Sequence, residues 1–116
     1  MKISEKIKIP TYDIYIGLND ADTRQQKFDT DRYFKIVKNV LKNYKVGFSI
    51  KTSTGGYFHD DGDFVQENSI VVTLIGAKED NVNEIAADLC AFFNQEEVMV
   101  SASEIETYSV REGFDF

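Results

Sequence analysis

The sequence contains few of the residues that give small domains covalent or metal-based stability. Its 116 residues include one cysteine, one proline, one histidine and no tryptophan. A single cysteine, Cys90, excludes an internal disulfide, and its apolar neighbours indicate a small buried side chain rather than a reactive thiol. One histidine cannot build a usual zinc or iron site, which takes several imidazole or thiolate ligands. We therefore expect neither a metal nor a cofactor.

Long apolar runs are also missing. No stretch approaches the roughly 20 apolar residues of a membrane-spanning helix, and residues 1–10 alternate lysine with isoleucine instead of forming the apolar centre of a signal peptide. These absences predict a soluble cytoplasmic protein without a membrane partner, located in the host cytoplasm if the chain is viral.

The residues that are present describe an ordinary globular chain, with 42% hydrophobic and 28% charged residues. A chain of this length buries roughly two thirds of the surface that it exposes when unfolded, which is enough for one core. We expect a single domain over residues 1–116. Its core covers about residues 12–101, preceded by an N-terminal arm (1–10) and followed by a C-terminal tail (102–116).

Charge is distributed unevenly along the chain. Residues 1–58 carry a net charge of +5 and residues 59–116 carry −12, which gives the total of −7. A negative total argues against direct nucleic-acid binding, because phosphate affinity comes from lysine and arginine. An acidic surface favours a protein partner with a basic surface instead.

Apolar periodicity predicts the elements of the fold. Strands are expected over residues 12–18, from Val46, over 64–75 and over 97–101, with the first segment ending at Pro10. One helix follows a cap at Asp29 or Thr30, and a second follows a cap at Asp80 or Asn81. Residues 53–56 allow a bend or bulge, and the turn at residues 60–63 reverses the chain to make a long hairpin.

This βαββαβ order predicts an α+β, ferredoxin-like fold, a four-stranded antiparallel sheet with two helices on one face. The C-terminal tail alternates weakly and can add an edge strand. The other face of the sheet is expected to show a mixed set of residues: Tyr15, Ser49, Lys51, Val71, Thr73 and Met99. Such a face is commonly covered by a second subunit, which makes a homodimer a candidate.

Several segments resemble a bacterial domain family of unknown function with a ferredoxin-like fold. They read YIGL, GGYF, DDGDF, QENSIVVTLI and FFNQEEVMV, and the resemblance covers about residues 12–100. It implies the following pattern positions: Gly17, Tyr57, Gly62, Glu67, Ser69, Phe93, Gln95 and Val98. The chain departs from the pattern at Tyr57, where the family has tryptophan, and near Glu67, where Gln66 or Asn68 replaces a common arginine.

The segment from Gly55 to Ser69 concentrates glycine, acids and the single histidine. His59 with Asp60, Asp61, Asp63 and Glu67 has the residue types of a metal or acid–base site. The spacing lacks the donor series of a calcium loop, so a solvated turn is the preferred interpretation. No nucleophile–base–acid pattern is present, and we expect no catalytic residues. His59, Tyr57 and Tyr15 remain candidates for a ligand site.

Two function classes follow. The first is a non-enzymatic interaction protein, such as an anti-CRISPR-like or anti-defence inhibitor that occupies a basic nucleic-acid-binding groove. Its acidic surface would comprise Asp60, Asp61, Asp63, Glu67, Glu104, Glu106, Glu112 and Asp115, and a secondary basic face on the first helix would comprise Lys35, Lys38, Lys42 and Lys45. The second class is a ferredoxin-like small-molecule-binding protein or enzyme that acts as a homodimer.

Overall fold

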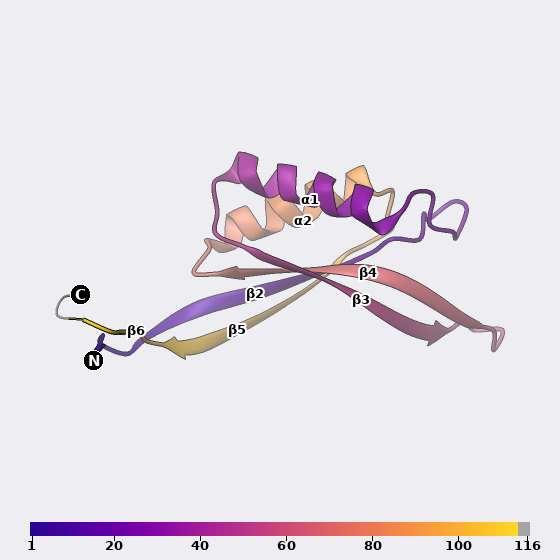
Figure 1. Cartoon of the computed structure of the whole chain (residues 1–116). Coiled ribbons are helices and arrows are strands. Elements are labelled where there is room, and N and C mark those ends of the chain that lie inside the picture. Colours follow the sequence, from indigo (N-terminus) through magenta and orange to yellow (C-terminus); the bar gives the residue numbers. More distant parts are fainter. Residues whose placement is uncertain (114–116) are drawn as a thin grey trace.

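Two α-helices lie side by side on one face of a twisted antiparallel sheet (Figure 1). A computed structural model describes residues 1–113. The sheet contains β2 (Ile7–Gly17), β3 (Ser49–Phe58), β4 (Phe64–Ile75) and β5 (Met99–Thr107), in the order β3-β4-β2-β5. The helices are α1 (Thr30–Tyr44) and α2 (Glu79–Phe92). This arrangement confirms the ferredoxin-like prediction.

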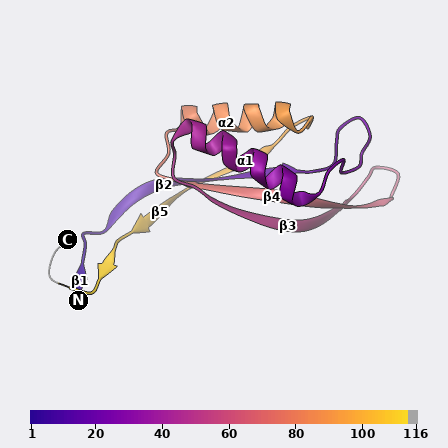
Figure 2. The same cartoon turned by 45° about the horizontal axis from the view of Figure 1, so that its top comes forward.

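The molecule extends well beyond the helices at both ends of the sheet. The β3–β4 hairpin projects at one end, and β2 and β5 continue as a two-stranded arm at the other (Figures 1 and 2). The second arm ends in a small ribbon of β1 (Lys2–Ile3) and β6 (Val110–Arg111). The C-terminal tail thus first prolongs β5 and then pairs with the N-terminal segment.

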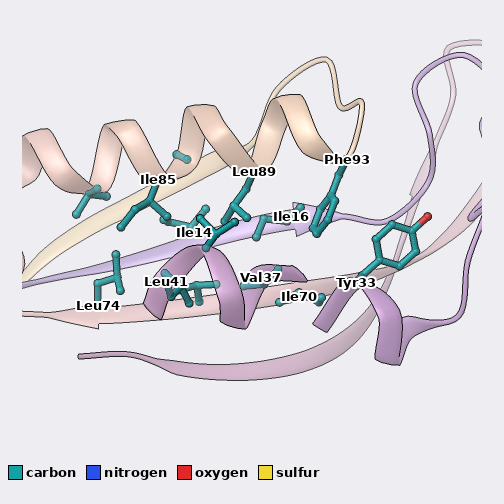
Figure 3. Close-up of a cluster of buried hydrophobic side chains, with 14 of the residues drawn as sticks. Ile14, Ile16, Tyr33, Val37, Leu41, Ile70, Leu74, Ile85, Leu89 and Phe93 are labelled. Carbon is teal, nitrogen blue, oxygen red and sulfur yellow. The ribbon is translucent and has the colours of Figure 1, made fainter. Parts of the chain in front are cut away.

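The core lies between the helices and the sheet (Figure 3). Ile14 and Ile16 of β2 and Ile70, Val72 and Leu74 of β4 are fully buried there. Their alternation places these side chains on one face of each strand, as the period of two predicts. The helices contribute apolar side chains at three- and four-residue spacing: Tyr33, Val37, Val40, Leu41, Val82, Ile85, Ala86 and Leu89.

Strand register fixes the composition of the face without helices. Tyr15 is paired with Val71 on one side and with Met99 on the other, and Thr73 is paired with Ser49. Paired residues point to the same face, so the predicted open face is correct in its members. Met99 is 61% exposed, whereas Val71 is only 5% exposed.

The prediction that Pro10 ends the N-terminal segment is wrong, because Pro10 lies inside β2. It is paired with Glu104 of β5, and its carbonyl accepts a 2.8 Å hydrogen bond from the Gly76 amide. The ladder between β2 and β4 begins only at Thr11. The missing amide hydrogen of Pro10 therefore falls where β4 has already ended, which is an edge position that tolerates proline.

Helix two begins two to three residues earlier than predicted. Its N-cap is Lys78, which makes no side-chain capping bond, rather than Asp80 or Asn81. Helix one follows the prediction, because Asp29 caps it by accepting a hydrogen bond from the Arg32 amide. The expected bend at residues 53–56 is also wrong, since β3 pairs with β4 without interruption through Gly55 and Gly56.

Candidate functional site

A cavity of about 540 Å³ lies where β2 and α2 end and the β3–β4 hairpin begins to project. Three separate parts of the chain form its walls. These are the loop after β2, the strands of the hairpin and the segment after α2. The lining residues are Asn19, Asp20, Ala21, Arg24, Tyr57, His59, Val65, Glu67, Gln95, Glu96 and Glu97.

Glu67 is the half-buried carboxylate of this cavity. One of its oxygens, Oε2, accepts a 2.9 Å hydrogen bond from the backbone amide of Asn19. The other, Oε1, lies against Gly17, because a Cβ placed on that glycine would be 2.5 Å from it. Within residues 1–113 no lysine, arginine or histidine forms an ion pair with Glu67. The site therefore holds a positioned carboxylate without a cationic partner.

Asp20 shapes the loop after β2. Its carboxylate accepts hydrogen bonds from the amides of Asp22 and Thr23 and from Nδ2 of Asn94, and it forms a 3.1 Å ion pair with Lys27. The hydrogen bond from Asn94, followed by that from the Thr23 amide, holds the pKa of Asp20 well below its usual range. Asp20 is 5% exposed, so it is a buried anion with its charge already satisfied.

The segment after α2 fastens the same loop from the other side. Nε2 of Gln95 donates a 2.6 Å hydrogen bond to the carbonyl of Asn19. The peptide groups on either side of Asn19 are thus held by Glu67 at the amide and by Gln95 at the carbonyl. These bonds join three distant segments into one wall of the cavity.

Two of the three predicted ligand-site residues lie at the cavity. Tyr57 and His59 both line it, and their rings meet edge to face at 5.4 Å. Tyr15 does not line it, because it lies farther along the open face between Val71 and Met99.

The predicted acidic surface is divided between opposite ends of the molecule. Asp60, Asp61 and Asp63 occupy the turn of the projecting hairpin and its approach to β4, whereas Glu104 and Glu106 lie on β5 in the other arm (Figure 1). Glu112 follows β6, and Asp115 lies outside the described residues. The predicted basic face is exposed as expected on α1 and its C-cap. Binding of a basic partner through these acids stays a prediction.

The described part of the chain contains no cluster of side chains arranged as metal ligands. No group of three or more histidine, cysteine, aspartate or glutamate side chains is placed to hold an ion there. Likewise, no helix within residues 1–113 combines the length and apolar character needed to cross a membrane.

The sequence indicates Tyr57, His59 and Glu67 and, through the family resemblance, Gln95, but not the other residues that line the cavity. Asn19, Asp20 and Arg24 lie in residues 19–27, whose polar, turn-rich sequence predicts a loop and no site. The Asp20 carboxylate accepts hydrogen bonds from the amides two and three residues later, as in an Asx turn. An aspartate at the start of a turn-rich segment is therefore the sequence signal that could indicate the role of Asp20. Nothing in the sequence indicates that this loop faces Glu67, 48 residues away along the chain.

Solved structures share this fold over most of their length. A phage SAM lyase in complex with S-methyl-5'-thioadenosine has a TM-score of 0.63 at 21% identity, covering 92% of this chain and 93% of its own. The nitrogen regulatory PII-like protein CPII from Thiomonas intermedia K12, bound to ADP, AMP and bicarbonate, has a TM-score of 0.52 at 13% identity, with 89% and 98% covered. The GlnK–ATP complex of B. subtilis has a TM-score of 0.54 at 13% identity, with 83% and 82% covered.

These similarities correct the expectation that the chain is not an enzyme. That expectation depended on the absence of a recognisable catalytic pattern. A phage SAM lyase, which is an enzyme, has this fold along 93% of its own length, so the lack of a recognisable pattern does not exclude an enzyme. A comparison with curated proteins gives no match.

The sequence itself assigns the family. Residues 11–108 match the family described as Protein of unknown function (DUF3574). The chain belongs to this family, which confirms the resemblance to a domain family of unknown function.

Proposed function

We propose that this DUF3574 protein binds SAM in the cavity at Glu67 and cleaves it to S-methyl-5'-thioadenosine. The observation that carries the proposal is the carboxylate of Glu67, which is positioned by Asn19 and Gly17 and has no cationic partner in residues 1–113. A half-buried anion of this kind favours a cationic ligand, because the charge of the ligand replaces the missing counter-ion.

Charge separates this ligand from those of the other structural neighbours. The cavity is lined by four carboxylates and one arginine, besides His59. ADP, AMP and ATP carry phosphates, which need lysine and arginine around them. SAM instead carries a positive sulfonium and a net positive charge, so the acidic lining attracts SAM and repels nucleotides.

The dimensions and the few apolar groups of the cavity suit a nucleoside. Its volume of about 540 Å³ lies within the range of roughly 300–1,000 Å³ that is typical of small-molecule sites. Tyr57, which is 45% exposed, and Val65 offer an aromatic ring and an aliphatic surface to an adenine base.

The proposed reaction breaks one bond. SAM and S-methyl-5'-thioadenosine differ by the aminocarboxypropyl group, so the bond between sulfur and the γ-carbon must break and its electron pair must pass to sulfur. When the fragment's own carboxylate attacks the γ-carbon, the fragment leaves as a lactone that keeps the positive charge of its ammonium group. When a base removes a β-proton, the fragment leaves as an unsaturated zwitterionic amino acid and the proton stays on the base. Glu67 can act as that base in the second route and as a counter-ion in both.

The charge of the sulfonium disappears as the bond breaks. Glu67 and its acidic neighbours therefore stabilise bound SAM more than the neutral product. An interaction accelerates a reaction only if it is stronger in the transition state than in the bound substrate. Because the attraction to these carboxylates weakens as the positive charge disappears, they contribute mainly to affinity and selectivity for SAM. A base at Glu67 would contribute to the rate in addition, typically by a factor of about 10² to 10⁴.

The test is incubation of the purified protein with SAM, with S-methyl-5'-thioadenosine and the four-carbon product identified by chromatography and mass spectrometry. Glu67→Gln keeps the size of the side chain and removes its charge, and we expect it to weaken SAM binding by about 10- to 100-fold. Glu104→Gln, in the arm opposite the cavity, is the matched control and should leave binding unchanged. The proposal is wrong if the wild-type protein neither binds SAM nor releases S-methyl-5'-thioadenosine. Binding without release would overturn the lyase reaction.

The inhibitor function expected from charge has weaker support. An inhibitor that fills a basic groove needs its acids on one surface, and here they are divided between the hairpin and the opposite arm. We therefore propose the small-molecule function in its place.

A further inference from the structure

Arg24 lies in an unusual backbone conformation at the wall of the cavity. Its φ is +58°, in the left-handed region, and its amide donates a 2.7 Å hydrogen bond to the carbonyl of Asp20. Residues other than glycine, asparagine and aspartate rarely adopt this conformation, which costs roughly 1–2 kcal/mol. The local backbone would be less strained with asparagine, so the arginine side chain is the feature that needs an explanation.

The guanidinium of Arg24 has no partner among residues 1–113. No carboxylate lies within ion-pair distance of it, although Glu67, Glu96 and Glu97 line the same cavity. Lys27, the other cation of this loop, is paired with Asp20 at 3.1 Å. The loop thus uses one cation to neutralise its buried aspartate and presents the other to the cavity.

Arg24 and Glu67 line the same cavity without forming an ion pair. Glu67 is held over Gly17 by its bond to the Asn19 amide, and the backbone of Arg24 lies in a turn held by Asp20 and Asn94. Two opposite charges that share a cavity without pairing suit a ligand that carries both charges at a distance from each other.

We propose that Arg24 binds the carboxylate of the amino-acid portion of the ligand, while Glu67 faces its sulfur. This assignment rests on the proposed function, in which the ligand is SAM. The planar guanidinium can bind a carboxylate through two parallel hydrogen bonds, which fixes orientation as well as position. Arg24 then distinguishes SAM from S-methyl-5'-thioadenosine, which lacks the carboxylate, and favours release of that product.

The test uses nucleosides that are not cleaved because their sulfur is neutral. S-adenosylhomocysteine and its decarboxylated form differ only by the carboxylate, and their Kd values are measured by isothermal titration calorimetry. We expect the wild-type protein to prefer S-adenosylhomocysteine. Arg24→Asn, which removes the guanidinium and keeps a residue that tolerates positive φ, should weaken S-adenosylhomocysteine by about tenfold or more and leave the decarboxylated form unchanged.

Two controls make the outcome decisive. Lys35→Gln removes the same charge from the exposed face of α1 and should alter neither Kd, and the thermal midpoint of Arg24→Asn should match or exceed that of the wild type. If wild-type protein binds the nucleosides but Arg24→Asn weakens both forms equally, or neither, the assignment of Arg24 is overturned and the proposed function stands. If wild-type protein binds none of these nucleosides and no SAM, the proposed function itself fails.

Discussion

The carboxylate of Glu67 lies directly over Gly17. Gly17 is paired with Ser69, which follows Glu67 by two residues along β4. The hydrogen of the glycine leaves the space that the carboxylate fills, and the Asn19 amide then fixes one of its oxygens. Gly17 is therefore part of the candidate site, although it carries no functional group.

Gly17→Ala should weaken ligand binding with little loss of stability. A Cβ at this position would lie 2.5 to 2.7 Å from the three carboxylate atoms of Glu67, so the flexible end of that side chain must move away. We expect SAM affinity to fall by about tenfold, as for a lost charged hydrogen bond, while the urea midpoint changes little. Gly55→Ala is the matched control, because Gly55 is paired with Glu67 and a Cβ there meets no atom within 4 Å. Equal effects of the two substitutions on binding would contradict the role of Gly17.

Lys78→Asp should stabilise the protein. Lys78 is the N-cap of α2 and makes no side-chain capping bond, and its positive charge lies at the positive end of the helix dipole. Aspartate can accept a bond from the first-turn amides, so the free energy of unfolding should rise by about 1 kcal/mol in urea titrations. Lys78→Ala separates capping from charge removal, since it removes the charge without capping. A gain of the same size for alanine would attribute the effect to charge.

Tyr44→Phe should abolish one tyrosine titration at high pH. The Tyr44 hydroxyl donates a 2.6 Å hydrogen bond to Asp88, and this bond, with burial and the nearby negative charge, raises the pKa of Tyr44 to about 12. The folded chain therefore holds this proton more tightly than the unfolded chain, whose tyrosine pKa is about 10. The stability that the bond contributes is present below about pH 10 and is lost as the pH rises toward 12.

Absorbance at 295 nm measures this titration directly. Tyr44→Phe should lack the step near pH 12, and Asp88→Asn should shift that step toward the ordinary tyrosine pKa. An unchanged step in Asp88→Asn would show that the Asp88 carboxylate is not its cause.

Asp20→Asn should destabilise the chain at neutral pH but less so in acid. The Asp20 carboxylate has a lowered pKa in the folded chain, so its contribution to stability is present above the unfolded pKa of about 4 and is lost progressively below it. The difference in thermal midpoint between wild type and variant should therefore shrink as the pH falls from 5 toward 2. Asp60→Asn, in the exposed hairpin turn, should show no comparable trend. A difference that stays constant with pH would exclude the carboxylate as the stabilising group.

The fold could be predicted because local patterns agreed with the final packing. Tyr33, Val37 and Leu41 are spaced for one helix face, and they are buried on it. The predictions for Pro10 and for the start of α2 are wrong for a common reason, since local rules about proline and capping do not include neighbouring strands or tertiary contacts. β4 ends beside Pro10, and helix α2 forms from its buried stripe without a capping side chain.

The candidate site was only partly predictable because tertiary packing brings it together. Tyr57, His59 and Glu67 belong to one hairpin, so a single unusual segment marked them. Arg24 and Gln95 reach the same cavity from loops on other sides, and their roles depend on which carbonyls and carboxylates they meet there. Composition alone suggested an acidic binding protein, whereas the positions of the acids relative to one arginine suggest a small dipolar ligand.

Cys90 offers an internal reporter on this cavity. Its thiol donates to the carbonyl of Gln95 at 3.1 Å, and Gln95 in turn holds the loop through Asn19. The chain has no other cysteine, so a thiol reagent would modify one position in the whole protein. A ligand that tightens the segment after α2 should slow that modification. The rate of thiol modification at this partly buried contact would then measure occupancy of the cavity without knowledge of the reaction.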